Sequence, residues 1–335
     1  MDNYSWFKES GYGMMIHWGL YSLLGGEYKG GRVKDYAEWI QSYFQIPNNE
    51  YEKLASAFNP IGFNAEDYVK LASECGMKYI VITTKHHDGF AMFHSRTDKY
   101  NVYDVTPFHT DVLAEFARAC KKYGIKLGIY YSQDLDWHHP HGGGYLSNHI
   151  YNSGTTWDNS WDFKGEKNFD ICFEEKIIPQ VCEIMTNYGE ISLAWFDVPM
   201  TIKPEQSELI YKTVKKLQPD CLINSRLGNG KYDYVSLGDN EIPQRMEIAD
   251  DREIDYNNIG GFKPSPHGLY ETAATLNDTW GFSYYDNNWK SAGIIAENRK
   301  HLNSLGINYL INIGPDPLGR IPTAASMILK KASKI

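Results

Sequence analysis

Eight short apolar runs alternate along this chain with stretches of helical periodicity. The runs cover residues 14–19, 79–84, 127–132, 191–197, 221–226, 234–239, 271–277 and 309–313. Strands that alternate with helices are typical of βαβ units and a parallel sheet, and eight such units close into a barrel. The sequence therefore predicts an α/β fold, a (β/α)8 TIM-like barrel, and its 335 residues suit a single domain over residues 1–335.

The helical pattern is clearest in the first half of the chain. Residues 65–75 and 112–123 have an apolar face, and each stretch is followed by a glycine that can end a helix in the left-handed conformation. Residues 322–334 predict a last helix. After Arg226 glycines interrupt the helical period, so we expect an irregular second half. Residues 138–161 predict a long loop on the active-site face, the alternative being a surface excursion without fixed structure.

The run that ends in Asp197 carries the first functional signal. Residues 193–196 are continuously apolar, as expected of a buried parallel strand, and the run then ends in a carboxylate followed by Val198 and Pro199. Barrel enzymes place their active sites at the carboxyl ends of the strands. Asp197 is therefore a candidate active-site acid, although a strand-end aspartate can also cap the next helix or turn.

Polar side chains also follow the other predicted strands. A lone histidine is more often structural than catalytic, but these groups share one end of the barrel and should converge on one cleft. They are His17 with Trp18, His86 with His87, Tyr131 with Ser132, Arg226, Asp239 with Glu241, and Glu271.

Metal, nucleophilic and dinucleotide chemistry fit this set poorly. His86 and His87 are adjacent, so on a strand they would point to opposite sides and could not bind one ion unless the chain bends. The sequence contains no HExxH, GxSxG or GxGxxG motif. We therefore expect neither a metal ion nor a cofactor, and a metal-dependent barrel hydrolase is the alternative reading.

Paired carboxylates fit glycoside hydrolysis, in which one acid attacks or stabilises the sugar and the other protonates the leaving oxygen. Asp197 is the expected nucleophile, and Arg226, His17 or His86 should hold its pKa down. Asp239, Glu241 and Glu271 are the candidates for the acid/base. The 25 Tyr and 9 Trp suit a carbohydrate cleft, because flat rings stack on sugars.

Charge and cysteine content narrow the partners and the location. A net charge of −9 opposes nucleic-acid binding, and a neutral small molecule fits better. The five cysteines are odd in number and widely spaced, so we expect reduced thiols. The first residues show no basic and apolar signal pattern, and no apolar run reaches transmembrane length, which predicts a cytoplasmic protein without membrane contact.

At these residues the chain resembles the α-L-fucosidases of glycoside hydrolase family 29. The resemblance runs in order along nearly the whole chain, and the His-Trp-Gly and Lys-His-His-Asp-Gly-Phe strings are its most specific parts. The matching motifs are Trp6-Phe7, Tyr12–Gly19 as YGMMIHWG, Ala37-Glu38-Trp39, Thr84–Phe90 as TKHHDGF, Tyr130-Tyr131-Ser132 with Trp137-His138, Trp195-Phe196-Asp197, and Thr275–Phe282 as TLNDTWGF.

The resemblance implies a retaining mechanism in which Asp197 attacks the anomeric carbon of L-fucose. It implies a fucose subsite, with Trp280, Phe282 or Trp18 as the apolar wall for the C5 methyl group and the hydroxyls bound by His17, Glu38, Trp39, His86, His87, Tyr131 and Arg226. The position of the acid/base varies in this family and points here to residues 238–243. Asp239 is preferred, Glu241 is the alternative and Glu271 the third choice.

Three further expectations follow from the resemblance. Many family members carry a β-sandwich after the barrel, whereas this sequence resembles the single-domain type. A barrel of that type would shield its cleft by forming a homo-oligomer. The same site would serve a transfucosidase, which transfers fucose to a sugar hydroxyl in place of water.

Overall fold

A computed structural model describes residues 4–145, 157–246 and 264–335. Eight parallel strands form its main sheet, in the order β7-β6-β5-β4-β1-β10-β9-β8. The strands are β1 (Tyr12–Ile16), β4 (Tyr79–Lys85), β5 (Lys126–Tyr131), β6 (Leu193–Phe196), β7 (Leu222–Ile223), β8 (Val235–Ser236), β9 (Tyr270–Thr275) and β10 (Ile307–Ile313).

The two edge strands meet, so the sheet closes on itself. Asn224, directly after β7, forms a parallel bridge with Tyr234, directly before β8, and the backbone N–H of Tyr234 donates to the carbonyl of Ile223. All eight predicted strands are present, and the prediction of a (β/α)8 TIM-like fold is confirmed.

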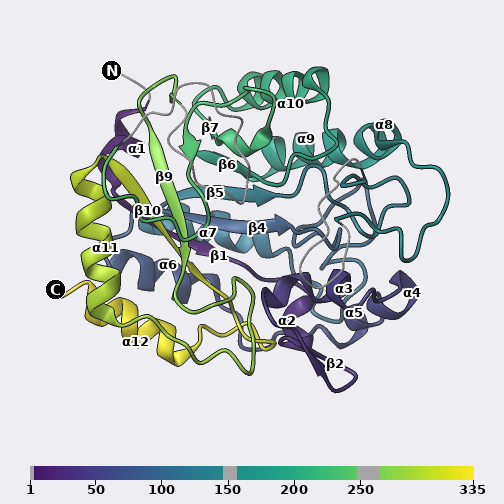
Figure 1. Ribbon diagram of the computed structural model, residues 1–335, viewed down its shortest axis with the longest axis horizontal. Helices are drawn as coiled ribbons and strands as arrows, with labels where there is room; N and C mark the ends of the chain where they lie inside the picture. Colours follow the sequence, from purple (N-terminus) through teal and green to yellow (C-terminus); the bar gives the residue numbers. More distant parts are fainter. Residues whose placement is uncertain (1–3, 146–156, 247–263) are drawn as a thin grey trace.

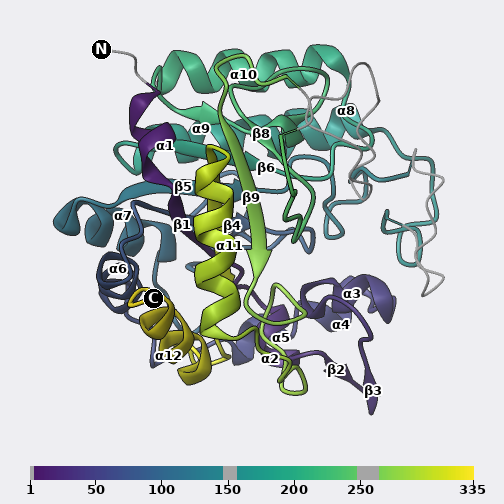
Figure 2. The same cartoon turned by 60° about the vertical axis from the view of Figure 1, so that its left-hand side comes forward.

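Helices surround the outside of the sheet (Figures 1 and 2). The α-helices are α1 (Ser5–Ser10), α2 (Tyr21–Leu24), α3 (Ile40–Tyr43), α4 (Asn48–Tyr51), α5 (Leu54–Ala57), α6 (Ala65–Glu74), α7 (Val112–Tyr123), α8 (Phe169–Cys172), α9 (Ile178–Asn187), α10 (Pro204–Leu217), α11 (Ala292–Ser304) and α12 (Thr323–Ala332). Short helical turns are η1 (Ala37–Trp39), η2 (Phe173–Ile177, a π-helix) and η3 (Ser225–Leu227), and β2 (Glu27–Tyr28) pairs with β3 (Gly31–Arg32).

The predicted helices over residues 65–75, 112–123 and 322–334 correspond to α6, α7 and α12. Gly76 and Gly124 follow the first two with φ of +78° and +66°, as their left-handed role requires. Asn64 and Asp111 cap the other ends by accepting the backbone N–H groups of Glu66 and Ala114.

Side chains of the strands alternate between two cores. Met14 and Ile16 of β1 face the helices, whereas Met15 faces the barrel interior. Large rings fill that interior, among them Tyr79, Tyr130 and Trp195. The alternation decides which residue of each strand end can reach the site.

The second half is irregular, as predicted. The strands β7 and β8 have two residues each, and η3 is the helical element between them. The predicted loop 138–161 lies partly outside the described residues; residues 138–145 are loop and turn, and Trp157 lies in the site described below. Within the described ranges, no helix has the length and apolar character needed to span a bilayer.

Candidate active site

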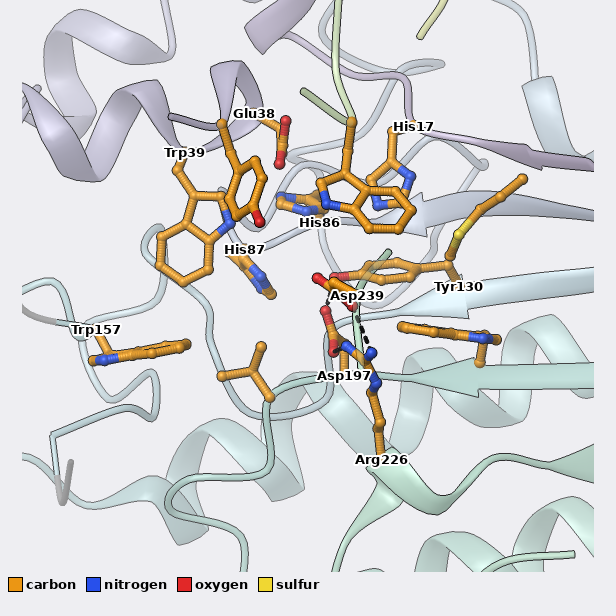
Figure 3. A pocket seen from close by; sticks show the side chains of 15 residues that line it. His17, Glu38, Trp39, His86, His87, Tyr130, Trp157, Asp197, Arg226 and Asp239 are labelled. Atoms are coloured by element: carbon orange, nitrogen blue, oxygen red, sulfur yellow. Dashed lines mark hydrogen bonds and ion pairs between the residues drawn. The ribbon is translucent and has the colours of Figure 1, made fainter. Parts of the chain in front are cut away.

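A pocket opens at the carboxyl ends of the strands (Figure 3). Its walls combine aromatic rings with ionisable side chains. The lining residues are Met15, His17, Tyr36, Glu38, Trp39, His86, His87, Tyr130, Trp157, Trp195, Asp197, Val198, Arg226, Asp239 and Trp280.

Asp197 follows β6 directly and points into this pocket (Figure 3). Its Oδ2 accepts a hydrogen bond of 2.8 Å from the Tyr130 hydroxyl, and its Oδ1 lies 3.1 Å from Nη1 of Arg226. Burial raises the pKa of Asp197 and Asp239 raises it further, against the opposite effects of Arg226 and Tyr130. The expected lowering of this pKa is therefore not found, because burial raises the pKa by more than the Arg226 guanidinium lowers it.

Arg226 joins two carboxylates. Besides Asp197, its guanidinium contacts Asp239, with Nη2 2.5 Å from Oδ1 of that residue. The same Nη2 donates to the carbonyl of Leu237 at 2.9 Å, and the guanidinium lies over the ring of Trp195, 4.6 Å from its centroid. Asp239 is one-third exposed, whereas the Asp197 side chain is 14 % exposed. The guanidinium thus holds a deep and a shallow carboxylate together.

The other two acid/base candidates lie elsewhere. Glu241 is not among the pocket-lining residues, and its Oε2 accepts the backbone N–H of Gly238 at 2.8 Å. Glu271 is at the amino end of β9, buried below the pocket, where it accepts hydrogen bonds from Tyr79 at 2.5 Å and Trp195 at 2.9 Å. Burial raises the pKa of Glu271 to about 7. The expected place of Glu271 at the carboxyl end of a strand was wrong, because it is the second residue of β9.

The three predicted histidines line the pocket together. His17 lies 2.8 Å from Oδ1 of Asn312, and His87 lies 2.7 Å from Oγ of Ser132. Burial lowers the pKa of His17 to about 4 and that of His86 and His87 well below the ordinary value. All three rings are therefore neutral near pH 7, each with one donor and one acceptor nitrogen.

His86 and His87 do not point to opposite sides. The strand β4 ends at Lys85, so both residues lie in the bend beyond it, with ring centroids 4.1 Å apart. Neighbouring side chains alternate between faces only within a strand, so they need not do so in this bend.

The first wall of the pocket comes from the segment after β1. Glu38 and Trp39 lie in η1, and Oε2 of Glu38 accepts the backbone N–H of Gly281 at 2.8 Å and the Thr279 hydroxyl at 3.2 Å. Burial raises the pKa of Glu38 to about 7. These bonds connect η1 to the segment that carries Trp280. The part of the pocket wall formed by Glu38 and Trp39 is therefore held against the part formed by Trp280.

Tyr131 does not reach the pocket. It faces the helix layer, where its hydroxyl donates to Oε1 of Gln180 at 2.8 Å, and Tyr130 takes the place beside Asp197. Of the three candidates for an apolar wall, Trp280 lines the pocket, whereas Trp18 packs against Phe58 and Phe63 and is covered. The third, Phe282, is not among the lining residues.

Several lining residues were missed from the sequence. Tyr36 and Trp157 lie in segments without periodicity, and no motif signalled them. Tyr130 could have been chosen over Tyr131 by alternation, because Tyr130 is in phase with the inward-facing Trp195 of the paired strand β6.

Comparison with known proteins identifies the family. Its sequence profile, described as alpha-L-fucosidase, matches residues 1–334. Tissue alpha-L-fucosidase of Mus musculus is 26% identical over 340 residues, covering 95% of this chain and 66% of the mouse protein. The human tissue enzyme is 27% identical over 341 residues, covering 95% and 64%. The chain thus spans about two-thirds of the length of these curated relatives.

Solved structures agree with that match. The alpha-L-fucosidase AlfC from Lactobacillus casei, in complex with alpha-L-fucose product, is 62% identical with a TM-score of 0.92, over 100% of this chain and 98% of AlfC. The alpha-L-fucosidase from Vibrio sp. strain EJY3 is 32% identical with a TM-score of 0.86, over 99% of this chain and 54% of the other. The chain belongs to the α-L-fucosidase family.

Proposed function

We propose that this protein is an α-L-fucosidase that hydrolyses terminal α-L-fucosyl linkages of oligosaccharides or glycoconjugates with retention of configuration. The observation that carries the proposal is the triad of Asp197, Arg226 and Asp239 in a pocket of a chain 62% identical to a fucosidase solved with fucose. Carboxylates on both sides of a glycosidic bond are what retaining hydrolysis needs.

In the first step an oxygen of Asp197 forms a bond to the anomeric carbon while the bond to the aglycone oxygen breaks. Asp239 gives its proton to that oxygen. In the second step Asp239 takes a proton from water, the water oxygen attacks the anomeric carbon, and Asp197 leaves as a carboxylate.

Arg226 fits both steps. In the free protein the guanidinium contacts both carboxylates. In the covalent intermediate Asp197 is a neutral ester, so the guanidinium faces Asp239 alone and stabilises it as the carboxylate that must act as a base. Asp239 is preferred over Glu241 and Glu271 because it lines the pocket.

The neutral rings fit a neutral sugar. His17, His86 and His87 offer donor and acceptor nitrogens to hydroxyls, and Glu38 lies on the opposite side of the pocket from Arg226 (Figure 3). Trp280 gives the apolar surface that the C5 methyl group needs. We assign these residues to the fucose subsite.

We propose fucose α1,6-linked to N-acetylglucosamine as a substrate. The support is a structure of AlfC in complex with Fuca(1,6)GlcNAc, to which this chain is 60% identical with a TM-score of 0.90. Transfer is the second candidate function, because two AlfC structures are described as fucosyltransferase mutants. Product analysis with added N-acetylglucosamine separates transfer from hydrolysis.

We also propose a reducing, cytoplasmic location, and action without a metal ion or other cofactor. Four of the five free cysteines are buried, and such thiols are typical of a reducing compartment. Unchanged activity after dialysis against a chelator tests the metal statement.

The test of the function is Asp197→Ala with 4-nitrophenyl α-L-fucopyranoside. We expect a loss of roughly 10³-fold or more in kcat with an unchanged circular dichroism spectrum. Azide should then restore turnover and give the β-fucosyl azide, because it attacks from the face that Asp197 has vacated. Retained turnover in the variant, or a wild-type protein without turnover, would contradict the proposal.

A further inference from the structure

The residue after Asp197 has a strained backbone. Val198 has a φ of +52°, in the left-handed region that a β-branched side chain rarely adopts. The other described non-glycine residues with positive φ are Lys29, Gln45, His109, Asn229 and Asn240. Within the described ranges, Val198 is thus the one β-branched residue in this conformation.

The conformation has a geometric result. In a strand, neighbouring side chains point to opposite faces, yet Asp197 and Val198 both line the pocket. The regular strand β6 ends at Phe196. The left-handed turn therefore brings the Val198 side chain to the pocket wall, where it packs with Trp39 and Trp157 and is 8 % exposed.

The segment before Val198 is held by Gln133. Its Oε1 accepts the backbone N–H of Asp197 at 2.8 Å, and its Nε2 donates to the carbonyl of Arg226 at 3.0 Å. Gln133 is fully buried. One amide thus fixes the backbones of the acid and of the arginine that contacts it.

The segment after Val198 is held by Asp134, the neighbour of Gln133 in the sequence. Its Oδ2 accepts the backbone N–H groups of Thr201 at 2.5 Å and Ile202 at 2.7 Å. The Thr201 hydroxyl in turn accepts the backbone N–H of Gly144 at 2.7 Å. Strained residues persist when their surroundings fix them from both sides, and Gln133 and Asp134 do so here.

We propose that Val198 is a positioning residue: its left-handed backbone, held by Gln133 and Asp134, sets the direction from which the Asp197 carboxylate meets the sugar. This rests on the proposed function, in which Asp197 is the nucleophile. A relaxed turn would let Asp197 sample directions away from the line of attack, and such misalignment lowers the rate of the chemical step more than binding.

The test compares Val198→Ala with Val198→Gly. Both remove the isopropyl group, but alanine keeps the strain whereas glycine relieves it and frees the backbone. The matched control is Gln45→Ala against Gln45→Gly, at an exposed residue outside the pocket with a φ of +48°. At both positions we expect the glycine variant to have the higher Tm.

We expect activity to separate the two positions. Assayed well below Tm with 4-nitrophenyl α-L-fucopyranoside, Val198→Gly should have a kcat roughly ten-fold below that of Val198→Ala, with KM changed less than about two-fold. The two Gln45 variants should have equal kcat. Equal kcat for the two Val198 variants, or a higher Tm for Val198→Ala, would overturn the proposal.

Failure of the function and failure of this inference are distinguishable. If wild type hydrolyses the fucoside and Asp197→Ala does not, the function stands, and the Val198 pair alone decides the positioning role. Should Val198→Gly not fold, Gln133→Ala takes its place, because it removes the bond that holds the backbone N–H of Asp197. Its kcat should then be roughly ten-fold below that of wild type, with KM changed less than about two-fold; an unchanged kcat would overturn the proposal.

Discussion

The two sides of the pocket are built in different ways. The longer strands β1 and β4 lead to the neutral histidines His17, His86 and His87. The short strands β6, β7 and β8 lead to the charged residues Asp197, Arg226 and Asp239. We call these the neutral side and the charged side.

Side chains replace strand pairing on the charged side. The ladder between β6 and β7 ends at Ala194 and Ile223. Beyond it, Asn224 accepts the N–H of Phe196 and donates to its carbonyl, both at 2.9 Å. A strand end held by side chains can turn away from the regular path, which is how this side brings a carboxylate and a guanidinium into contact.

Removal of the shared cation should have the largest effect. Arg226→Met leaves Asp197 and Asp239 side by side without a counter-charge, and we expect a loss of roughly 10³-fold in kcat/KM. Because the guanidinium lowers the pKa of Asp197, its loss should also move the acidic limb of the pH–rate profile to higher pH. Arg226→Lys keeps the charge and should lose less; equal losses in both variants would contradict a role for the charge.

The buried acid beneath the pocket gives a pH-dependent effect on stability. The folded protein raises the pKa of Glu271 to about 7, so it binds a proton that the unfolded chain releases above its ordinary pKa. Glu271 therefore contributes stability at low pH that is lost as the pH rises toward 7. Relative to wild type, Glu271→Gln should gain up to about 3 kcal/mol of unfolding free energy between pH 4.5 and pH 8.

Denaturant unfolding at several pH values measures this difference. The exposed Glu205→Gln serves as the control and should follow wild type throughout. A difference between Glu271→Gln and wild type that does not change with pH would show that Glu271 is ionised at all these values.

Removing the Asn224 side chain, which supports the charged side, should lower kcat, whereas removing a matched asparagine elsewhere should lower stability alone. Asn224→Ala leaves the N–H and carbonyl of Phe196 buried without partners, which costs about 2–3 kcal/mol. Asn308 of β10 is the control, since it also bonds two backbone groups, of Gly11 and Phe7. We expect similar losses of stability by chemical denaturation, and a lower kcat for Asn224→Ala alone.

The smallest effect is expected on the neutral side. His17→Gln keeps a donor and an acceptor but shifts them, and we expect about a ten-fold loss in kcat/KM, mainly through KM. His94→Gln, outside the pocket, should leave both constants unchanged. A loss in kcat as large as that of Arg226→Met would end the distinction between the two sides.

The sequence predicted the strands better than the directions of side chains. Continuous apolar runs between turn residues located all eight strands, because burial of a parallel sheet imposes that pattern. Tyr130 and Tyr131 are both aromatic and both belong to the family motif, so only their alternation with respect to Trp195 separates them.

Features that depend on bends and burial could not be predicted. His86 and His87 share the pocket because β4 ends at Lys85, directly before them, so both lie in the bend that follows the strand. The raised pKa of Asp197 depends on how much water the fold excludes. The single domain over residues 1–335 and the homo-oligomer stay predictions.

The closure of the barrel has a consequence for thermal inactivation. In the part of the chain that the structure describes, one β-bridge, Asn224 to Tyr234, joins the ends of β7 and β8, and Arg226 and Asp239 lie on the two sides of that seam. Local opening there would part this ion pair before the remaining sheet melts. On heating, we expect amide hydrogen exchange to accelerate first along the seam, and activity to vanish while most of the circular dichroism signal persists.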